Sequence, residues 1–558
     1  ATWNMKLLSV SLFTLLVLQA NGAKILAVLP LPIFSHHNFF KPILNEIANR
    51  GHDLTVITML PDKGANYTTI EVDGTIIEKM KGTFDFFEMR NSYWFFEFIG
   101  LYQFSSTVSN IMFQMPEIQK LIHSTDLHFD AVITESTFMQ ELYVAFGHKF
   151  QAPIIELHSL CNGFWFNHLT GNPSTYSYIV DYKTRSSNKM DFYNRFKNTI
   201  LGISTLILHD LIILPKQEKL MNEYMNYTGW EKRPPIRKML AETSLALVNT
   251  HEALHYAQPK NPNVIYVAGL HMKPAKKLPQ DLQKYLDDAK EGVIYFSMGS
   301  NIKSAMMPDH TKQALLKAFG KLPYKILWKF ETETLPNKPE NLKISKWLPQ
   351  TDILRHPNVK AFITHGGIVS ITESVYCKVP MVTIPIFGDQ PKNSKQAEIA
   401  GFGVTLVFDN ITEESVIWAV NEVLKPKYKE AVIQRANIIL DNPLSPMDTA
   451  MYWIDYVIRH KGAPHLRTAA VNLEWYQYFL LDVLVLFLAI VIVMLIIIYL
   501  FLRAVFRRLF GKKENVKSAK KEKLVNVINK LVKRETLNIR QNKYTQFTFK
   551  FFGFKLFY

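Results

Sequence analysis

The stretch from residue 347 to residue 390 constrains the fold most, because its pattern predicts a strand, a glycine turn, a helix and a second strand in direct succession. Ala361–Thr364 is a short apolar strand, His365-Gly366-Gly367 is the turn, the helix begins at Ile368, and Met381–Ile384 is the second strand. Glycines between a parallel strand and a helix let the backbone N–H groups at the helix start approach an anion closely. The turn is therefore a candidate cradle for a diphosphate.

Aromatic and polar side chains flank this turn on both sides. Trp347 and Gln350 precede it, and Glu373, Asp389 and Gln390 follow it. A flat stacking face, carboxylates and amides are the groups that a nucleotide sugar needs for its base, its ribose and its sugar hydroxyls. Each group also has an ordinary interpretation, because a lone His-Gly-Gly is usually only a turn and a lone Trp usually belongs to a core. Only the whole string separates the two interpretations.

The whole string resembles the signature segment of the UDP-glycosyltransferase family, which includes the animal UDP-glucuronosyltransferases and UDP-glucosyltransferases, with the insect-type members most similar. The shared pattern comprises W-x-P-Q, D-x-L-x-H-P, F-I-T-H-G-G, the Glu of the following helix and G-D-Q. The resemblance implies an α/β fold of the GT-B type, with two Rossmann-like domains facing each other across a cleft. It also implies a UDP-sugar as co-substrate and no metal, and the sequence contains no D-x-D motif of the metal-dependent sugar transferases.

The resemblance also assigns roles to residues of the second half. It implies Trp347 beside uracil, Gln350 near the base or ribose, and Glu373 on the ribose hydroxyls. The remaining assignments are Ser300, His365 and the backbone amides of Gly366 and Gly367 at the diphosphate, and Asp389 and Gln390 at the sugar hydroxyls. Lys329 occupies a position where relatives often have Arg, which makes its role less secure.

The chain before residue 274 predicts a first α/β half. The strand Lys24–Leu29, a loop over 30–38, the helix Phe39–Arg50 and the strand Leu54–Thr58 open a doubly wound sheet. A linker rich in Pro, Lys and Asp follows at residues 274–291. It separates a first domain, residues 23–273, from a second domain, residues 292–478. No G-x-G-x-x-G occurs, which disfavours a dinucleotide-dependent oxidoreductase.

Glycosyl transfer to a hydroxyl needs a base for the acceptor proton, and histidine has a suitable intrinsic pKa. His36 follows the first strand and Glu135 follows a later one, where ligands bind in such sheets. A carboxylate beside the histidine would fix its tautomer and stabilise the imidazolium. The resemblance maps the catalytic histidine to His36 and the catalytic aspartate to Glu135, whose arm is one methylene longer. His37 is an adjacent competitor for the role of base.

Both ends of the chain carry targeting signals. Residues 1–22 predict a secretory signal peptide, and residues 479–502 are apolar and long enough to cross a bilayer. The net charge is +16, but residues 503–558 hold 16 Lys+Arg and 3 Asp+Glu, a charge of +13, which leaves +3 for the remainder. A basic flank directly after the span predicts a cytoplasmic tail and a type I protein of the endoplasmic reticulum membrane with lumenal domains, and argues against nucleic-acid binding.

Three further regions carry weaker predictions. The aromatic segment 84–104 indicates an apolar acceptor pocket, a buried helix or a helix resting on a membrane, and the family resemblance favours the pocket. Residues 524–539 predict a basic amphipathic helix. Cys161 and Cys377 fall in different predicted domains, so each is expected to be a buried thiol rather than half of a disulfide.

These observations predict an inverting UDP-glycosyltransferase that moves a hexose, glucose before glucuronic acid, to a hydroxyl of a small lipophilic acceptor. The alternative is a catalytically inactive relative that sequesters lipophilic ligands. Retention of both His36 and a carboxylate at position 135 argues against that alternative. A homo-oligomer is compatible with either prediction.

Overall fold

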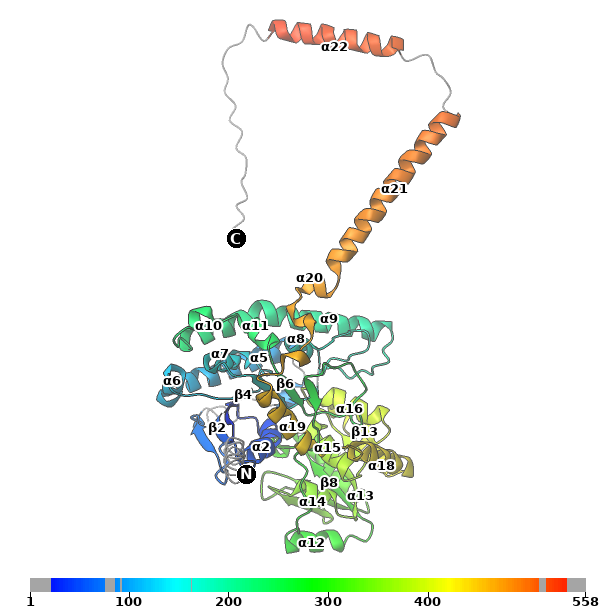
Figure 1. The fold of residues 1–558 in the computed structure, drawn as a ribbon. Coiled ribbons are helices and arrows are strands. Elements are labelled where there is room, and N and C mark those ends of the chain that lie inside the picture. The colour runs from blue at the N-terminus through cyan, green and yellow to red at the C-terminus, as the bar shows by residue number, and fades with distance from the viewer. Residues whose placement is uncertain (1–21, 76–85, 91–92, 162, 511–517, 539–558) are drawn as a thin grey trace, which may run out of the picture. The chain divides into compact units, whose positions relative to one another are not determined.

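The computed structural model describes residues 22–75, 86–90, 93–161, 163–510 and 518–538 (Figure 1). The predicted signal peptide lies outside these residues apart from its last position, and so does the end of the basic tail. The chain divides into two compact units, residues 1–472 and residues 473–558, and the first unit contains both sheets.

The first sheet has seven parallel strands in the order β3-β2-β1-β4-β5-β6-β7. The strands are β1 (Lys24–Val28), β2 (Asp53–Thr58), β3 (Thr68–Glu71), β4 (Ala131–Thr134), β5 (Ile154–His158), β6 (Leu245–Val248) and β7 (Val264–Tyr266). The helical segments of this half are α2 (Phe34–Asn49), α4 (Phe86–Met89), α5 (Trp94–Phe113), α6 (Pro116–His123), η1 (Glu141–Val144), α7 (Ala145–Phe150), α8 (Phe164–Thr170), α9 (Phe192–Leu208), η2 (His209–Ile213), α10 (Leu214–Tyr224), η3 (Trp230–Lys232) and α11 (Ile236–Ala241). The strand order reverses between β1 and β4, and ligands bind beside such a switch point in parallel sheets.

The second sheet has six parallel strands in the order β10-β9-β8-β11-β12-β13. They are β8 (Val293–Ser297), β9 (Lys325–Lys329), β10 (Leu342–Ser345), β11 (Val359–Thr364), β12 (Met381–Thr383) and β13 (Gly403–Thr405). The helical segments of this half are α12 (Gln280–Asp287), η4 (Ser304–Met306), α13 (Asp309–Lys321), α14 (Gln350–Leu354), α15 (Ile368–Tyr376), α16 (Gln390–Ile399), η5 (Phe408–Asn410), α17 (Glu413–Val423) and α18 (Pro426–Leu440). The switch point here lies between β8 and β11, directly before the glycine turn.

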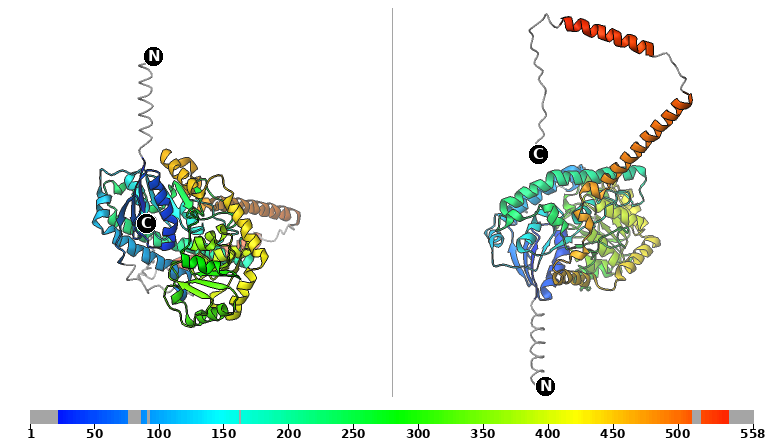
Figure 2. Two further views of the ribbon diagram at one scale, coloured as in Figure 1. Left: turned by 90° about the horizontal axis from the view of Figure 1, so that it is seen from below. Right: turned by 45° about the horizontal axis from the view of Figure 1, so that its top comes forward.

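The two sheets form two lobes, drawn blue to green and green to yellow in Figure 2 (left). After the second sheet the chain returns to the first lobe through α19 (Pro446–Arg459), which packs against α2. Arg50 donates to Asp448 at 2.7 Å, and His52 Nε2 lies 3.2 Å from an oxygen of Asp455. The unit ends with the short turns η6 (Pro464–Leu466) and η7 (Ala469–Asn472). The predicted arrangement of two Rossmann-like α/β halves is confirmed.

Two details differ from the sequence-based expectation. Helix α2 begins at Phe34 rather than at Phe39, because the helix-breaking residues Pro30 and Pro32 lie before Ile33, and His37 N–H already donates to the carbonyl of Ile33 at 3.0 Å. His36 therefore stands in the first turn of a helix and not in a loop. The segment 274–291 also contains α12, whose Leu282 and Leu286 pack into the core of the second lobe.

The second unit consists of α20 (Trp475–Tyr478), α21 (Leu481–Phe510) and α22 (Ser518–Asn538). By length and composition, α21 could cross a membrane, and so could the helical run Phe192–Tyr224 of the first unit, although 39% of the apolar 18-residue stretch within that run is buried. Both cysteines are free thiols, Cys161 buried and Cys377 partly buried, as the sequence predicts.

Candidate active site

The structure brings His36 and Glu135 together at the switch point of the first sheet. His36 lies in the first turn of α2, and Glu135 follows β4, the strand beside β1. Nδ1 of His36 is 2.8 Å from Oε1 and 3.0 Å from Oε2 of Glu135. Because a carboxylate can only accept, the ring donates Nδ1–H and keeps Nε2 as the free acceptor nitrogen. Both side chains are buried, His36 being 5% and Glu135 1% exposed. Glu135, whose side chain is one methylene longer than an aspartate, thus still lies within hydrogen-bonding distance of His36.

His37 has a different environment. It is only half-buried, and burial together with the charge of Lys41 lowers its pKa, while Asp62 acts in the opposite direction. Successive residues of a helix point about 100° apart, so His37 cannot share the position that His36 takes beside Glu135. Of the two adjacent histidines, His36 has the geometry of a base.

Glu135 is held in place by neighbours from β5 and the loop after it. Ser159 Oγ donates to Glu135 Oε1 at 2.7 Å. Glu156 on β5 accepts the backbone N–H groups of Ser136 at 2.7 Å and of Thr137 at 3.3 Å, which fastens the turn that carries Glu135. Burial raises the pKa of Glu156 to about 8, with the nearby charge of Glu135 adding to the increase and the hydrogen bonds from Ser136 opposing it.

Replacing Glu156 by glutamine is expected to flatten the pH dependence of stability. The folded chain holds a proton on Glu156 that the unfolded chain releases near pH 4.5, so this group makes stability fall as pH rises from about 4.5 to about 8. Glutamine does not titrate and has nearly the same shape. Unfolding temperatures of the wild type and E156Q, measured from pH 5 to pH 8.5, check this. Parallel curves for the two proteins would contradict the raised pKa.

The glycine turn of the second lobe is closely packed. Gly366 has φ +82°, and a Cβ there would lie 2.5 Å from Ser394 Oγ. Cβ atoms at Gly299 and Gly367 would lie 2.6 Å and 2.5 Å from atoms of the His365 ring. The turn therefore requires glycine, and it opens helix α15 with Gly367 as N-cap. Burial lowers the pKa of His365 to about 4, and the charge of Lys329 acts in the same direction, so this ring is neutral at pH 7.

Two of the predicted nucleotide-binding residues, Gln350 at the start of α14 and Glu373 on α15, are hydrogen-bonded to each other, and a third, Trp347, precedes α14. Gln350 Nε2 donates to Glu373 Oε2, and Thr351 Oγ1 donates to Glu373 Oε1 at 2.9 Å. Glu373 is 8% exposed, and the ring of His271 lies 3.6 Å from its carboxylate. Trp347 is 72% exposed, so one face of its indole is open to a base. The assignment of these residues to a uridine site stays a prediction.

Asp389 and Gln390 lie at the start of α16, close to the glycine turn. Asn393 Nδ2 donates to Asp389 Oδ2 at 2.6 Å and to the carbonyl of Gly366 at 3.2 Å. Gln390 Oε1 accepts the N–H groups of Ile386 at 2.8 Å and Phe387 at 3.2 Å, so this oxygen shapes its own loop. Burial raises the pKa of Asp389, and the hydrogen bond from Asn393 and the charges of His255 and His36 oppose the increase.

Hydrogen bonds join the catalytic side of the first lobe to the donor side of the second. Asn301, the neighbour of Ser300, donates to Ser35 Oγ at 3.1 Å, and Ser35 precedes His36. On the other side, His255 Nε2 lies 3.0 Å from Asn393 Oδ1. The influence of His36 on the pKa of Asp389 agrees with this proximity. The predicted base and the predicted sugar-binding carboxylate therefore both lie in the region where these hydrogen bonds join the two lobes.

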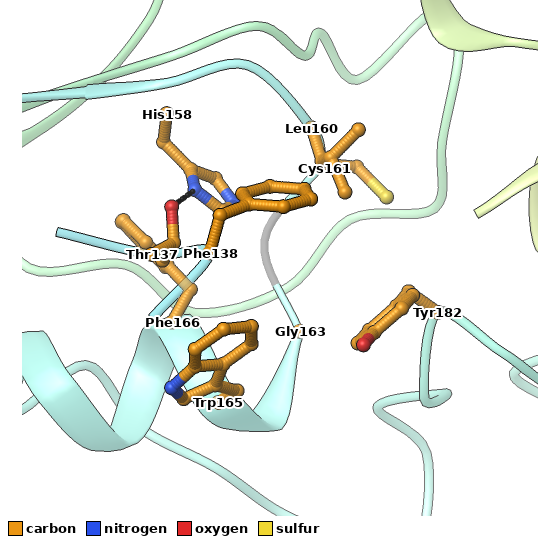
Figure 3. Close-up of a pocket in the computed structure, with 9 residues that line it drawn as sticks. All are labelled: Thr137, Phe138, His158, Leu160, Cys161, Gly163, Trp165, Phe166 and Tyr182. Carbon is orange, nitrogen blue, oxygen red and sulfur yellow. Dashed lines mark hydrogen bonds between the residues drawn. The ribbon is translucent and has the colours of Figure 1, made fainter. Parts of the chain in front are cut away.

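A small, mostly apolar cavity lies in the first lobe next to the turn that follows β4 (Figure 3). Phe138 forms one wall, and its ring meets that of His36 edge-on with 4.4 Å between centroids. Trp165, Tyr182 and Cys161 surround the remaining space, and Thr137 Oγ1 is hydrogen-bonded to His158 Nδ1 at 3.0 Å. Phe138 thus connects the cavity with the candidate base, because its ring lines the cavity and contacts the ring of His36. The side chains of the aromatic segment 84–104 differ in exposure: Phe98 is buried, while Tyr93 and Phe96 are exposed.

Several site residues had not been found from the sequence. They are Glu156, Ser159, Phe138, His255 and Asn393. Asn393 stands four residues after Asp389, so the helical spacing could have indicated it. Glu156 and Ser159 belong to β5 and the loop after it, Phe138 and His255 come from two other segments, and no motif surrounds any of the four. In the described part of the chain no group of three His, Cys, Asp or Glu side chains is arranged to hold a metal ion, and metal independence stays a prediction.

The two lobes, each built on a parallel α/β sheet, give the chain the GT-B fold. Comparison with solved structures agrees on the fold: the kitacinnamycin glycotransferase has a TM-score of 0.51 at 14% identity, covering 79% of this chain and 99% of that one. LpCGTa in complex with UDP has a TM-score of 0.50 at 16% identity, covering 79% of this chain and 100% of that one.

Sequence comparison identifies the family. The profile described as "UDP-glucoronosyl and UDP-glucosyl transferase" matches residues 23–516, so the chain belongs to this family. UDP-glycosyltransferase UGT5 of Dactylopius coccus is 39% identical over 519 residues, covering 89% of this chain and 96% of the relative. UDP-glucosyltransferase 2 of the same insect is 36% identical (86% and 92% covered), and UDP-glucuronosyltransferase 1-2 of Mus musculus is 32% identical (90% and 95% covered).

Proposed function

We propose that the chain transfers glucose from UDP-glucose to a hydroxyl of a small lipophilic acceptor, with inversion at the anomeric carbon, as in conjugation of foreign or waste compounds. The observation that carries this proposal is the buried His36–Glu135 pair, which lies one residue from a hydrogen bond to the Ser300 loop of the donor lobe. A UDP-sugar is the donor that the family uses.

The proposed reaction is a single in-line displacement. Nε2 of His36 takes the acceptor proton, and the acceptor oxygen bonds to the anomeric carbon as the bond from that carbon to the diphosphate oxygen breaks. The bonding electron pair leaves with UDP. Glu135, already bonded to Nδ1, stabilises the imidazolium that forms. One displacement without a covalent intermediate inverts the anomeric centre.

The glycine turn would stabilise the negative charge on the departing UDP. The N–H groups of Gly366 and Gly367 and the start of α15 offer positive potential without a metal ion. His365, neutral with a pKa of about 4, would contribute a hydrogen bond rather than a full charge. Asp389 and Gln390 would hold sugar hydroxyls, with Asp389 braced by Asn393.

The choice of glucose rests on the relatives. The Dactylopius coccus relative named as a UDP-glucosyltransferase is 36% identical, and the mouse relative named as a UDP-glucuronosyltransferase is 32% identical. We therefore favour glucose and treat glucuronic acid as the competing donor. The apolar side chains Phe138 and Trp165, of which Phe138 contacts the ring of His36, support a lipophilic acceptor.

We also propose that α21 anchors the protein as a single span in the endoplasmic reticulum membrane, with the lobes in the lumen. It is 30 residues long, and its apolar side chains are exposed along its whole length. The 16 Lys+Arg against 3 Asp+Glu of residues 503–558 support a cytosolic tail.

Microsomes that contain the protein are expected to release UDP from UDP-glucose when a simple phenol is added, and to release far less from UDP-glucuronic acid. Microsomes with a His36→Ala variant serve as the background. UDP release from UDP-glucuronic acid alone would agree with the proposed mechanism but contradict the choice of glucose as the transferred sugar. No UDP release from either donor over a broad acceptor panel, with UDP binding intact, would favour an inactive, ligand-sequestering relative.

A further inference from the structure

His271 lies on the segment that joins the two lobes, between the end of β7 at Tyr266 and the start of α12 at Gln280. Its side chain is 9% exposed, and among the described residues neither Nδ1 nor Nε2 has a hydrogen-bond partner. Buried polar atoms are normally hydrogen-bonded, because an atom that leaves water without a new partner costs free energy. A buried imidazole in this state needs a partner close by.

The group within reach is the carboxylate of Glu373. Nε2 of His271 is 3.6 Å from Oε1 of Glu373, about half an ångström beyond the usual N–H···O range. The same oxygen accepts Thr351 Oγ1 at 2.9 Å, and Oε2 accepts Gln350 Nε2. A carboxylate has about four acceptor positions. The two that remain are enough for the ring of His271 and for a hydroxyl of a ligand.

The segment around this histidine is fixed to the two helices that carry the nucleotide-site residues. Tyr376, at the end of α15, donates its hydroxyl to the carbonyl of Ala268 at 3.2 Å. Gly269 has φ +91°, and a Cβ there would lie 2.1 Å from the hydroxyl oxygen of Tyr376, so only glycine allows this close approach. Arg355, which follows α14, donates to the carbonyl of Lys273 at 2.5 Å. The ring is therefore held beside the carboxylate from both sides of the segment.

The ring is neutral at pH 7. Burial lowers the pKa of His271, while the charge of Glu373 acts in the opposite direction. A neutral imidazole has one N–H donor, and with that proton on Nε2 it can orient the carboxylate. It leaves the negative charge of the carboxylate in place, and that charge strengthens hydrogen bonds from hydroxyl donors.

We propose that His271 is a positioning residue of the nucleotide site, which holds the carboxylate of Glu373 for the ribose hydroxyls by donating Nε2–H to Oε1. The proposal deepens the proposed function and rests on the assignment of Glu373 to the ribose. A shift of about half an ångström brings the 3.6 Å separation into hydrogen-bond range. The segment that joins the lobes then takes part in nucleotide binding.

Replacing His271 by leucine or by phenylalanine in the full-length protein tests this role. Both side chains remove the ring nitrogens, and one is smaller and the other larger than histidine. Each variant is expected to weaken UDP binding by about 10-fold, the effect of losing one hydrogen bond to a charged group, and to leave the affinity for 2′,3′-dideoxy-UDP unchanged within about 2-fold. His271→Gln places an amide N–H near the position of Nε2 and should restore most of the loss. Calorimetry measures these affinities.

A double variant separates positioning from an independent contact. If His271 acts through Glu373, adding His271→Leu to Glu373→Ala should cause no further loss of UDP affinity. His310→Leu is the matched control, because it makes the same substitution at an exposed histidine on α13 of the same lobe. It should leave both nucleotide affinities unchanged.

Three results would overturn the role of His271: unchanged UDP affinity in the leucine and phenylalanine variants, equal losses for UDP and 2′,3′-dideoxy-UDP, or fully additive losses in the double variant. The ribose assignment survives these results if the wild type binds UDP more tightly than the dideoxy compound and Glu373→Ala removes the difference. Equal binding of the two nucleotides by the wild type would overturn the ribose assignment and this proposal together. Absence of any UDP binding would contradict the proposed function itself.

Discussion

Replacing His36 by alanine is expected to lower the rate of glycosyl transfer by about 10²- to 10⁴-fold, the range that a positioned general base contributes. Its Nδ1 is engaged by Glu135, so the remaining nitrogen is set to accept the acceptor proton. The predicted nucleotide contacts belong to the other lobe, and UDP binding should therefore survive. UDP release and UDP affinity, measured on the same preparation, check both parts.

His37→Ala is the matched control for this prediction. His37 is the next residue of the same helix, and the charges that act on it are those of Lys41 and Asp62 rather than that of Glu135. Turnover should remain within a few-fold of the wild type. If H36A retains turnover and H37A loses it, the assignment of the base is wrong. If both lose UDP binding as well, the first turn of α2 has been disrupted and Glu135→Gln becomes the decisive variant.

The fold was largely predictable because its signals are local. Strands such as β8 and β11 are short apolar runs that end at glycine or polar residues, and alternation with amphipathic helices indicates parallel sheets. The return of α19 onto α2 was not predictable in this way. It depends on pairs such as Arg50 with Asp448, which are far apart in sequence and carry no local pattern.

The two sides of the predicted site also differed in how far their residues lie apart along the chain. The donor residues from Trp347 to Gln390 follow one another along the chain, so a single motif contains them. The predicted acceptor side is assembled from α2, the turn after β4 and strand β5; the strand positions made His36 and Glu135 candidates, and the resemblance assigned them to one pair. Glu156 shows the limit most clearly. The role of a glutamate inside an apolar strand cannot be inferred until the backbone N–H groups that donate hydrogen bonds to it are known.

Glu373→Ala is expected to weaken UDP binding by about 10- to 100-fold, the value of one or two hydrogen bonds to a charged acceptor. In the structure this carboxylate accepts from Gln350 and Thr351 at the edge of the second sheet, where ribose hydroxyls would compete for it. Affinity for UDP and for 2′,3′-dideoxy-UDP, measured by calorimetry on wild type and variant, checks the role. The hydroxyls should matter in the wild type and hardly at all in the variant.

This comparison separates ribose recognition from a structural role. Glu373 is nearly buried beside His271, so its removal could also loosen the lobe and weaken every ligand. Loosening would lower the affinity for both nucleotides by the same factor, whereas loss of ribose contacts would act on UDP alone. Glu333→Ala, which removes an exposed carboxylate paired with Lys346 in the same lobe, should change neither affinity. Equal losses for the two nucleotides in Glu373→Ala would therefore reject the ribose assignment while leaving the fold and the His36 dyad unaffected.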